Sequence, residues 1–598
     1  MTSDTAPPAT THDPWAAFVH AAVDGLLEAS RRVGLSLDEP VIRSQLDLDG
    51  GAEGDLAFPV HRFAAASRQS PADLATALVS AFPATPLLPV VRASGAYVNF
   101  RVDPAALVRT TFDQVFAEGP QFGGGEPSPR PACVEHTSAN PTGPFHIGRV
   151  RNAIIGDTLA RVWRAHGARV TTQYYVDDMG RQAAMITWVW TKPRAEWPPT
   201  IRDAVEGKEV AGEKPDSHHG RPYPAVSAYL KEHPDAQAEV AEIVRAVEEG
   251  HPPPQHRQLT QEILSGMLVS LARLGITFDE FVWESDFLRD GSVDRAVARL
   301  KGAPHAVQEE NGAWAIDATG YGLPKESTRV VFQRPNGTTL YVTRDVAYHL
   351  SKFARFDRMV DVLGQDHQLH AKTLSALLAE IGESRRPEFL IYQDITVPEG
   401  GRMSTRGGSA VWLDGLLVEA VERARREVIA RREDLTPAEV DRIAEAVATG
   451  AIRFHVVRVA PDKPVVFRWE DALSFEGRSG PFVQYSYARA SSVLRKGEVG
   501  PPPYPYDPRL LSDPEELALV RLIARFPRTV AYVARTSHVH TIAGYAHELA
   551  DQFNRFYHAV PVLKSGAERE SRIALVAAVR QTLGNALDLL GVTRLETM

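Results

Sequence analysis

EHTSANPTGPFHIGR, residues Glu135–Arg149, separates a short apolar run at 132–135 from a long amphipathic run at 149–166. Its prolines, glycines and asparagine predict a loop, with a strand before it and a helix after it. A β-branched and aromatic run at 170–176 predicts the next strand. This order predicts one half of a doubly wound, Rossmann-type parallel sheet, in which ligands bind at the carboxyl ends of the strands.

The predicted loop has features that suit a nucleotide. The N-terminus of the following helix offers free backbone N–H groups and a partial positive charge to phosphate. His146 can donate a hydrogen bond to phosphate oxygens, and Gly148 leaves room for close approach. A loop that only starts a helix is the alternative, and a lone His-x-Gly would favour it. The position between a strand and a helix, beside a polar cluster, favours a ligand site.

Composition limits the class of protein. The 598 residues suggest about three to five domains. The single cysteine, Cys133, excludes an intrachain disulfide and a cysteine-rich zinc site. Residues 1–14 lack the pattern of a signal peptide, and no apolar run approaches the ~18 residues that span a bilayer. We expect a cytoplasmic protein without a membrane partner. The net charge of −9 neither favours nor excludes RNA.

The chain is predicted to be a multidomain α/β protein. We expect a disordered tail at 1–14, an α+β domain at 15–118 and a Rossmann-type catalytic domain at 126–410. A Pro-rich, charged insertion at about 190–257 contains one expected helix, at 236–249. Helical periodicity then predicts a helical linker region at 411–475 and an all-α bundle at 476–598. We also expect strands at 327–333, 340–343 and 359–363, and one helical stretch at 64–82.

Two motifs give a resemblance to a known family. His146–Arg149 resembles the HIGH signature of class I aminoacyl-tRNA synthetases, and the stretch through Asp157 is similar to the arginyl enzymes. Gly401–Gly407, GRMSTRG, resembles their second signature, KMSKS. Three positions depart from the pattern: Arg149 replaces a His, Arg402 replaces the first Lys, and Gly143 stands where some arginyl enzymes carry a compensating Lys.

The resemblance implies a set of ATP-binding and catalytic residues. The substrate carboxylate attacks the α-phosphorus of ATP, and the departing pyrophosphate needs positive charge. A basic surface turn is the alternative for 401–407 taken alone. The implied ATP-binding residues are Pro144, His146, Gly148, Arg149, Asn152 and Met403. The implied catalytic residues are His146, Gly148, Arg149, Arg402, Met403, Ser404 and Arg406.

A second segment implies that arginine is the substrate. Tyr341–Asp345, YVTRD, resembles the family's arginine-binding segment, in which Asp345 pairs with the guanidinium and Tyr341 packs against it. Their spacing of four puts both on one face of a strand or helical turn. A helix-terminal charge and a core aromatic are the alternatives. The implied arginine-binding residues are Glu135, Ser138, Asn140, Tyr341, Asp345, Asp366 and His367. Asp177, Asp178 and Gly180 are a weaker candidate, with an ordinary turn as the alternative.

The C-terminal part resembles the anticodon-binding bundle of the same family. Unstacked bases suit aromatic and guanidinium surfaces, although several of these rings could belong to the core. The candidates are Tyr485, Tyr487, Arg489, Phe553, Arg555, Phe556 and Tyr557. The resemblance also implies that 15–118 contacts the tRNA elbow and 411–475 the stem. The insertion resembles the archaeal-like subgroup.

The resemblance therefore implies an arginine–tRNA ligase. It would convert arginine and ATP to arginyl-adenylate and transfer the arginyl group to the 3′ end of tRNA(Arg), with tRNA bound before the first step. ATP is a substrate, Mg²⁺ is expected with it, no metal site or structural zinc is expected, and the chain is expected to be a monomer. Two alternatives remain open: a paralogue that loads another acceptor, and a non-catalytic tRNA-binding protein.

Overall fold

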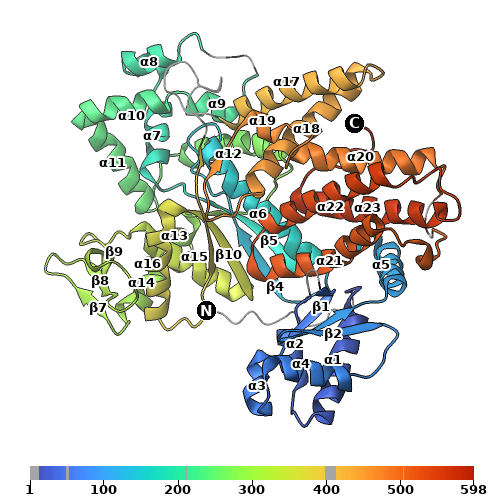
Figure 1. Ribbon diagram of the computed structural model, residues 1–598. Helices are drawn as coiled ribbons and strands as arrows, with labels where there is room; N and C mark the ends of the chain where they lie inside the picture. The colour runs from blue at the N-terminus through green and yellow to red at the C-terminus, as the bar shows by residue number, and fades with distance from the viewer. Residues whose placement is uncertain are drawn as a thin grey trace.

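The computed structural model describes residues 12–598 except 49–52, 209, 211, 397–411, 501 and 503 (Figure 1). Residues 1–11 of the predicted tail therefore lie outside the described part. So do Arg402, Met403, Ser404 and Arg406 of the second signature.

A five-stranded parallel sheet forms the centre, in the order β11-β10-β4-β5-β6 (Figure 1). Its strands are β4 Pro131–Glu135, β5 Arg169–Val176, β6 Glu280–Trp283, β10 Arg358–Gly364 and β11 Glu388–Tyr392. Helix α6, Ile147–Ala165, connects β4 to β5. The predicted parallel sheet is confirmed, with the loop 136–146 at its carboxyl edge.

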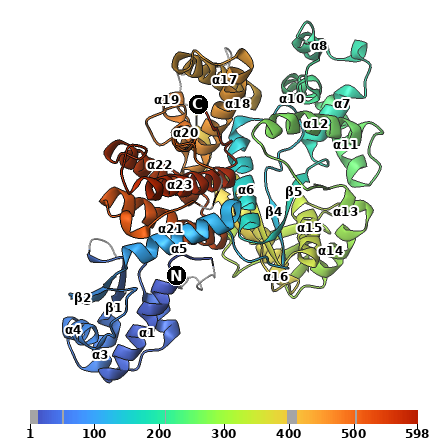
Figure 2. The ribbon, with the colours of Figure 1, turned by 90° about the vertical axis from the view of Figure 1, so that its right-hand side faces the viewer.

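Alternating strand residues give the sheet two apolar faces. Val134 and Val360 belong to the core shared with α6 and the C-terminal helices. Cys133 and Met359, one residue earlier in each strand, belong to a second core. That core contains α14 Ser292–Lys301, α15 Tyr341–Arg355 and α16 Gln368–Glu380. Helices therefore cover both faces (Figure 2).

Smaller sheets and helices flank the central sheet. Before α15 the chain forms α13 Asp286–Arg289 and an antiparallel sheet of β7 Ala306–Gln308, β8 Trp314–Asp317 and β9 Arg329–Gln333. Strands β12 Ile395–Thr396 and β13 Val465–Val466 form a short parallel pair. The N-terminal α+β part pairs β1 Leu56–Pro59, β3 Tyr97–Arg101 and β2 Val90–Ser94. Its helices are α1 Ala16–Arg32, α2 Glu39–Gln45, α3 His61–Ser67, α4 Pro71–Ala81 and α5 Pro104–Glu118.

The insertion contains more helix than the sequence suggested. Besides α11 Pro234–Glu248, the chain here forms α7 Arg181–Trp190, α8 Pro199–Val205, α9 Pro215–Gly220 and α10 Tyr223–Glu232, followed by α12 His256–Arg273. The expectation of one helical stretch was wrong because several prolines begin helices rather than interrupt them. These helices enclose an apolar core around Trp188, Ile201 and Leu230.

Two other expectations also fail. Residues 340–343 do not form a strand, because α15 begins at Tyr341 and its buried residues follow a helical period through Phe353. The helix expected at 64–82 is two helices, because Arg68 adopts a left-handed φ of 55° and a capping Ser70 starts the next one. The strands predicted at 327–333 and 359–363 correspond to β9 and β10.

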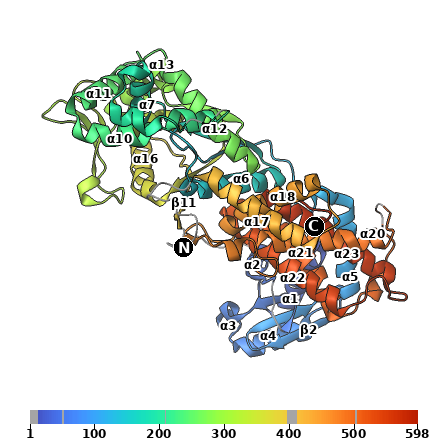
Figure 3. The same cartoon turned by 90° about the horizontal axis from the view of Figure 1, so that it is seen from above.

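The C-terminal part is helical, as predicted. Its helices are α17 Leu413–Arg431, α18 Pro437–Val457, α19 Trp469–Ala472, α20 Gly480–Lys496, α21 Pro514–Thr536, α22 His540–Ala559 and α23 Arg569–Leu590. By length and composition, α23 could cross a membrane, but 83% of its most apolar window is buried in the protein, as in a core helix. The bundle lies beside the part that contains the parallel sheet and contacts the N-terminal part through α5 (Figure 3).

Gly156 allows α6 to approach the β4 end closely. A Cβ at this position would lie 2.2 Å from the Cβ of His136, which the strand backbone holds in place. We expect Gly156→Ala to lower the free energy of unfolding by about 1–3 kcal/mol, the range for overpacking. Gly415→Ala is the matched control, because that helical glycine has nothing within 4 Å of a new Cβ. Equal urea-unfolding curves for the two variants would contradict the close approach.

Candidate active site

The loop after β4 ends on a histidine that caps α6. The His146 Nδ1 accepts a hydrogen bond of 2.9 Å from the Gly148 N–H, so the neutral ring has its other nitrogen free to donate. Burial, then the nearby charge of Arg149, lowers the pKa of His146 and favours that neutral form. A Cβ on Gly148 would lie 3.0 Å from Nδ1, so glycine leaves room for the capping ring.

The loop is fixed to the sheet by Asn152. Its Oδ1 accepts from the Thr137 N–H at 2.6 Å, and its Nδ2 donates to the Val362 carbonyl at 2.8 Å. Asn152 is only 4% exposed and its amide holds the loop in place, while the ATP contact expected for it stays a prediction. Thr137 and Ser138 have φ values of 73° and 38°, a strained conformation that these contacts maintain.

Ser138 joins the ends of two strands. Its Oγ donates to Glu135 Oε1 at 3.0 Å and accepts from the Tyr175 N–H at 3.0 Å. Exposed Asn140 donates to Asp177 at 3.3 Å and to Gln182 at 3.1 Å. Three of the predicted arginine-binding residues therefore lie along one short stretch of the sheet edge.

Asp345 lies on the second turn of α15 with a partner that the sequence did not reveal. The Nε2 of His370, on α16, bonds its Oδ2, and the ring of Tyr341 stacks on His370 with centroids 4.6 Å apart. Burial alone would raise the pKa of Asp345, but the hydrogen bond and charge of His370, with His349 and Lys352, lower it. The carboxylate is therefore ionised, at 19% side-chain exposure.

A buried ion network underlies Asp345. Lys352 Nζ lies 2.5 Å from Glu135 Oε2 and 2.6 Å from Asp361 Oδ1, and His349 Nε2 lies 2.7 Å from Asp361 Oδ2. Burial raises the pKa of Glu135 against the opposing effect of Lys352, whereas Lys352 and His349 together hold that of Asp361 low. The sequence analysis missed this network. The available signal was the three polar side chains at 345, 349 and 352, a helical spacing on the buried face of α15.

Contacts connect the start of α6 to Asp345. Arg149 lies 3.9 Å from Asp366, and Asp366 lies 3.7 Å from the His367 Nε2. The rings of His367 and His370 are 6.3 Å apart, and His370 bonds Asp345. The structure therefore brings together the candidates from the loop, from α15 and from the end of β10.

The weaker candidates at 177–180 have structural partners. Asp177 accepts from the Gly180 N–H at 2.8 Å in the turn before α7. Asp178 is 1% exposed and accepts from Ser285 and Arg257. Asp178 is thus occupied within the protein, whereas Asp177 also contacts exposed Asn140.

On each side of 397–411, described residues contact α6 or the loop that precedes it. Trp412 meets the His146 ring edge-on at 5.9 Å, and the Leu413 N–H donates to the Phe145 carbonyl at 2.8 Å. On the other side, Arg151 donates to the Gln393 carbonyl at 2.6 Å. The second signature is thus flanked by residues that contact the segment carrying the first.

The aromatic candidates of the bundle divide into surface and core. Tyr485, Arg489 and Tyr557 line one cavity of about 490 Å³, with the guanidinium 4.8 Å and 5.0 Å from the two rings. Arg555 is exposed beside Asp551. Tyr487, Phe553 and Phe556 are buried at 2%, 0% and 0% exposure, as the alternative that these rings belong to the core predicts.

Replacing Lys352 removes its buried ammonium group and should leave the carboxylates of Glu135 and Asp361 without a counter-charge. We expect Lys352→Met to lower the free energy of unfolding by about 3–5 kcal/mol at neutral pH. Without Lys352, burial would raise the folded-state pKa of Glu135 and Asp361 above the unfolded values of about 4. The variant should then lose stability as the pH rises through that range, so its deficit should be larger at pH 8 than at pH 5.

Urea unfolding at several pH values measures this deficit. Exposed Lys372→Met on α16 is the control and should change stability little. A deficit independent of pH would contradict the network as described.

Comparison with known proteins identifies the family. The model for "tRNA synthetases class I (R), catalytic domain" matches residues 113–469, and that for "DALR anticodon binding domain" matches 483–598. The arginine–tRNA ligase of Methanocella arvoryzae is 42% identical over 90% of this chain and 92% of its own. That of Methanothermobacter thermautotrophicus is 40% identical over 91% and 93%.

Comparison with solved structures agrees with the sequence comparisons. The Thermus thermophilus arginyl-tRNA synthetase matches with a TM-score of 0.80 and 28% identity over 97% of this chain and all of its own. The enzyme from Plasmodium falciparum, at 16% identity, shares the fold with a TM-score of 0.75 over 99% of this chain and all of its own. From the catalytic model and the relatives that match over nine-tenths of its length, the chain belongs to the class I arginyl-tRNA synthetases, the arginine–tRNA ligases.

Proposed function

We propose that arginine binds at Asp345 and ATP at the N-terminus of α6, so that the two react across the carboxyl edge of the sheet. The observation that carries this proposal is the ionised Asp345 carboxylate, joined by contacts through Asp366 and His370 to the start of α6. A cationic substrate side chain is the natural partner of such a carboxylate.

The guanidinium group of arginine would bind to one oxygen of the Asp345 carboxylate. His370 occupies Oδ2, and a carboxylate accepts at both oxygens, so Oδ1 remains for the substrate. Tyr341 is 57% exposed and would cover the guanidinium plane. Glu135, Ser138 and Asn140 would hold the α-amino and carboxylate groups, with Asp366 and His367 at the other side of the pocket.

Adenylate formation would depend on positive charge around the phosphates. The substrate carboxylate attacks the α-phosphorus, the bond to the bridging oxygen breaks, and pyrophosphate leaves. The first N–H groups of α6, His146 and Arg149 would stabilise the charge on the phosphates. Gly148 and Pro144 would border the nucleotide. Arg402, Met403, Ser404 and Arg406 would act on the pyrophosphate from the second signature.

Mg²⁺ would enter with the triphosphate and add positive charge there. Such an ion normally keeps most of its ligands from phosphates and water. In the described part of the chain, no three His, Cys, Asp or Glu side chains cluster to hold a metal. We assign no structural zinc.

Transfer of the arginyl group to tRNA would follow at the same carboxyl edge of the sheet. The 3′-terminal hydroxyl of tRNA attacks the carbonyl carbon of arginyl-adenylate, and AMP leaves.

We propose that Tyr485, Arg489 and Tyr557 stack anticodon bases, since a guanidinium near two rings suits unstacked bases. Exposed Arg555 would contact the backbone. Four parts of the chain would contact the tRNA: 15–118 its elbow, 126–410 its acceptor end, 411–475 its stem and 476–598 its anticodon. We further propose a cytoplasmic monomer.

Arginine-dependent exchange of pyrophosphate into ATP, with and without tRNA(Arg), tests the function. We expect exchange only with tRNA present, and charging of the tRNA in the same mixture. Exchange without charging would favour a paralogue with another acceptor. Binding of tRNA without exchange would favour a non-catalytic protein, and either result would reject the proposal.

Replacing Asp345 tests the arginine site. Asp345→Asn keeps the shape but removes the charge, so we expect the KM for arginine to rise at least about 100-fold, with the KM for ATP nearly unchanged. Exposed Asp317→Asn, on β8, is the matched control and should not alter either KM. An unchanged arginine KM in the Asp345 variant would remove the assignment.

A further inference from the structure

A charged cluster joins the insertion at about 190–257 to the helices beside it. Lys214, just before α9, places its Nζ 2.7 Å from Asp414 Oδ2, on the first turn of α17, and 3.1 Å from Asp216 Oδ2. The same Nζ donates to the Ser270 Oγ of α12 at 2.5 Å, and that hydroxyl donates to Asp414 Oδ1 at 2.7 Å. These four side chains, the Lys214 cluster, therefore connect α9, α12 and α17, which lie together in Figure 1.

The buried position of Asp216 shows that the cluster is built into the fold. Its side chain is fully buried, and burial raises the pKa of its carboxyl group against the opposing charge of Lys214. A Cβ on Gly266 of α12 would lie 2.4 Å from Asp216 Oδ1, so α12 leaves room for the carboxylate. Because desolvation offsets much of the attraction in such a cluster, apolar side chains would hold these helices equally well. The charged groups add directional contacts that fix the position of Asp414.

The start of α17 in turn holds the histidine that caps α6. The Leu413 N–H, one residue before Asp414, donates to the Phe145 carbonyl at 2.8 Å, and Trp412 forms a β-bridge with His146. The rings of Trp412 and His146 also meet edge-on, with centroids 5.9 Å apart. Asp414 therefore lies within two residues of the contacts that position His146.

A second contact brings the insertion against the loop before α6. Gly220 ends α9, and a Cβ there would lie 2.3 Å from Gly143 Cα and 2.9 Å from the Thr142 carbonyl oxygen. A side chain at this position would therefore push the loop away. The Trp190 Nε1, on α7, donates to the His219 carbonyl at 2.9 Å and fixes this end of the helix. The two ends of α9 thus hold the start of α17 and the loop that leads to α6.

We propose that Lys214 is a positioning residue for adenylate formation: through Asp414 it holds His146 and the N-terminus of α6 where they meet the phosphates of ATP. The inference rests on the proposed function, which places ATP at that N-terminus. Groups that stabilise a transition state must be in place when its charge develops, so a small displacement of them lowers the rate strongly. The insertion then contributes to catalysis without touching ATP or arginine.

Lys214→Met and Asp414→Asn test the inference in tRNA-dependent pyrophosphate exchange. We expect kcat/KM for ATP to fall about 10- to 100-fold in each variant, with part of the loss in KM, because the groups around the phosphates are misplaced. The KM for arginine should stay within about twofold, since α15, which carries Asp345, packs on the opposite face of the sheet from α12 and α17. A smaller folded fraction would instead lower kcat and leave both KM values unchanged. Asp414→Asn keeps the shape of the side chain and serves if Lys214→Met folds poorly.

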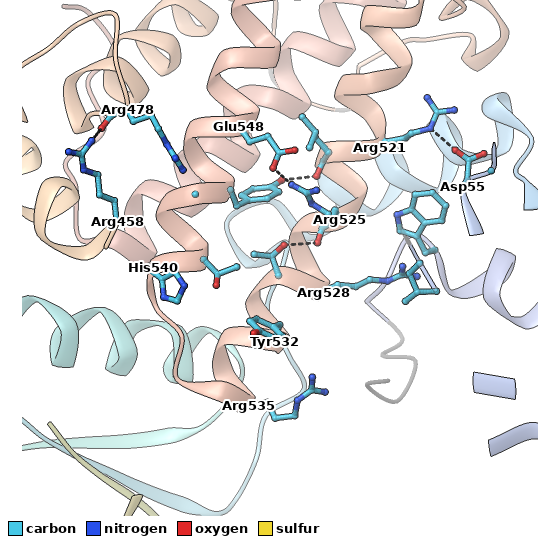
Figure 4. Close-up of a pocket in the computed structure, with 18 of the residues that line it drawn as sticks. Asp55, Arg458, Arg478, Arg521, Arg525, Arg528, Tyr532, Arg535, His540 and Glu548 are labelled. Carbon is cyan, nitrogen blue, oxygen red and sulfur yellow. Dashed lines mark hydrogen bonds and ion pairs between the residues drawn. The ribbon is translucent and has the colours of Figure 1, made fainter. Parts of the chain in front are cut away.

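A double-mutant cycle with His146→Ala measures whether Lys214 acts through that histidine. The variant Lys214→Met/His146→Ala should stay within about twofold of His146→Ala in kcat/KM for ATP, because the contribution of the histidine is already lost. Asp13→Asn is the matched control, since it breaks another largely buried ion pair, of 2.8 Å with Arg528 at the junction of the N-terminal part and α21 (Figure 4). It should lower the melting temperature and leave the KM for ATP unchanged.

The same variants separate failure of the inference from failure of the proposed function. An unchanged KM for ATP in both Lys214→Met and Asp414→Asn, or additive losses in the cycle, would overturn the inference and leave the cluster as a support for the fold alone. If His146→Ala itself left kcat/KM for ATP unchanged, the proposed placement of ATP would fail, and the inference would fail with it.

Discussion

The buried guanidinium of Arg151 is the interaction on which the geometry of the site depends. From the second turn of α6 it donates to the carbonyls of Gln393 and Lys463 at 2.6 Å and of Ala460 at 2.8 Å, and it is fully buried. Two segments far apart in sequence, at 393 and at 460–463, are thereby held to the helix that His146 caps. Because a buried charge is tolerated only with its acceptors in place, the loop before α6 and the flanks of 397–411 are fixed together.

The proposed arginine site is subject to the same constraint with the signs of the charges exchanged. Lys352 neutralises Glu135 and Asp361 beneath the surface, while Asp345 above them is ionised beside His370. The network has therefore fixed its carboxylates before any substrate arrives. In the proposed site, a guanidinium entering at Asp345 would meet a rigid acceptor and would not need to reorganise it, which favours both affinity and selectivity for a planar cation.

The sequence predicted the elements whose pattern is local. The strands at 132–135 and 170–176 and the helix after Gly148 follow from their periods, and the resemblance located the candidates at both signatures. The partners of those candidates could not be predicted, because His370 meets Asp345 only through the packing of α16 on α15. Tyr557 and Phe553 are four apart on α22, yet one is exposed and the other buried, since the edge of a broad apolar face depends on neighbouring helices.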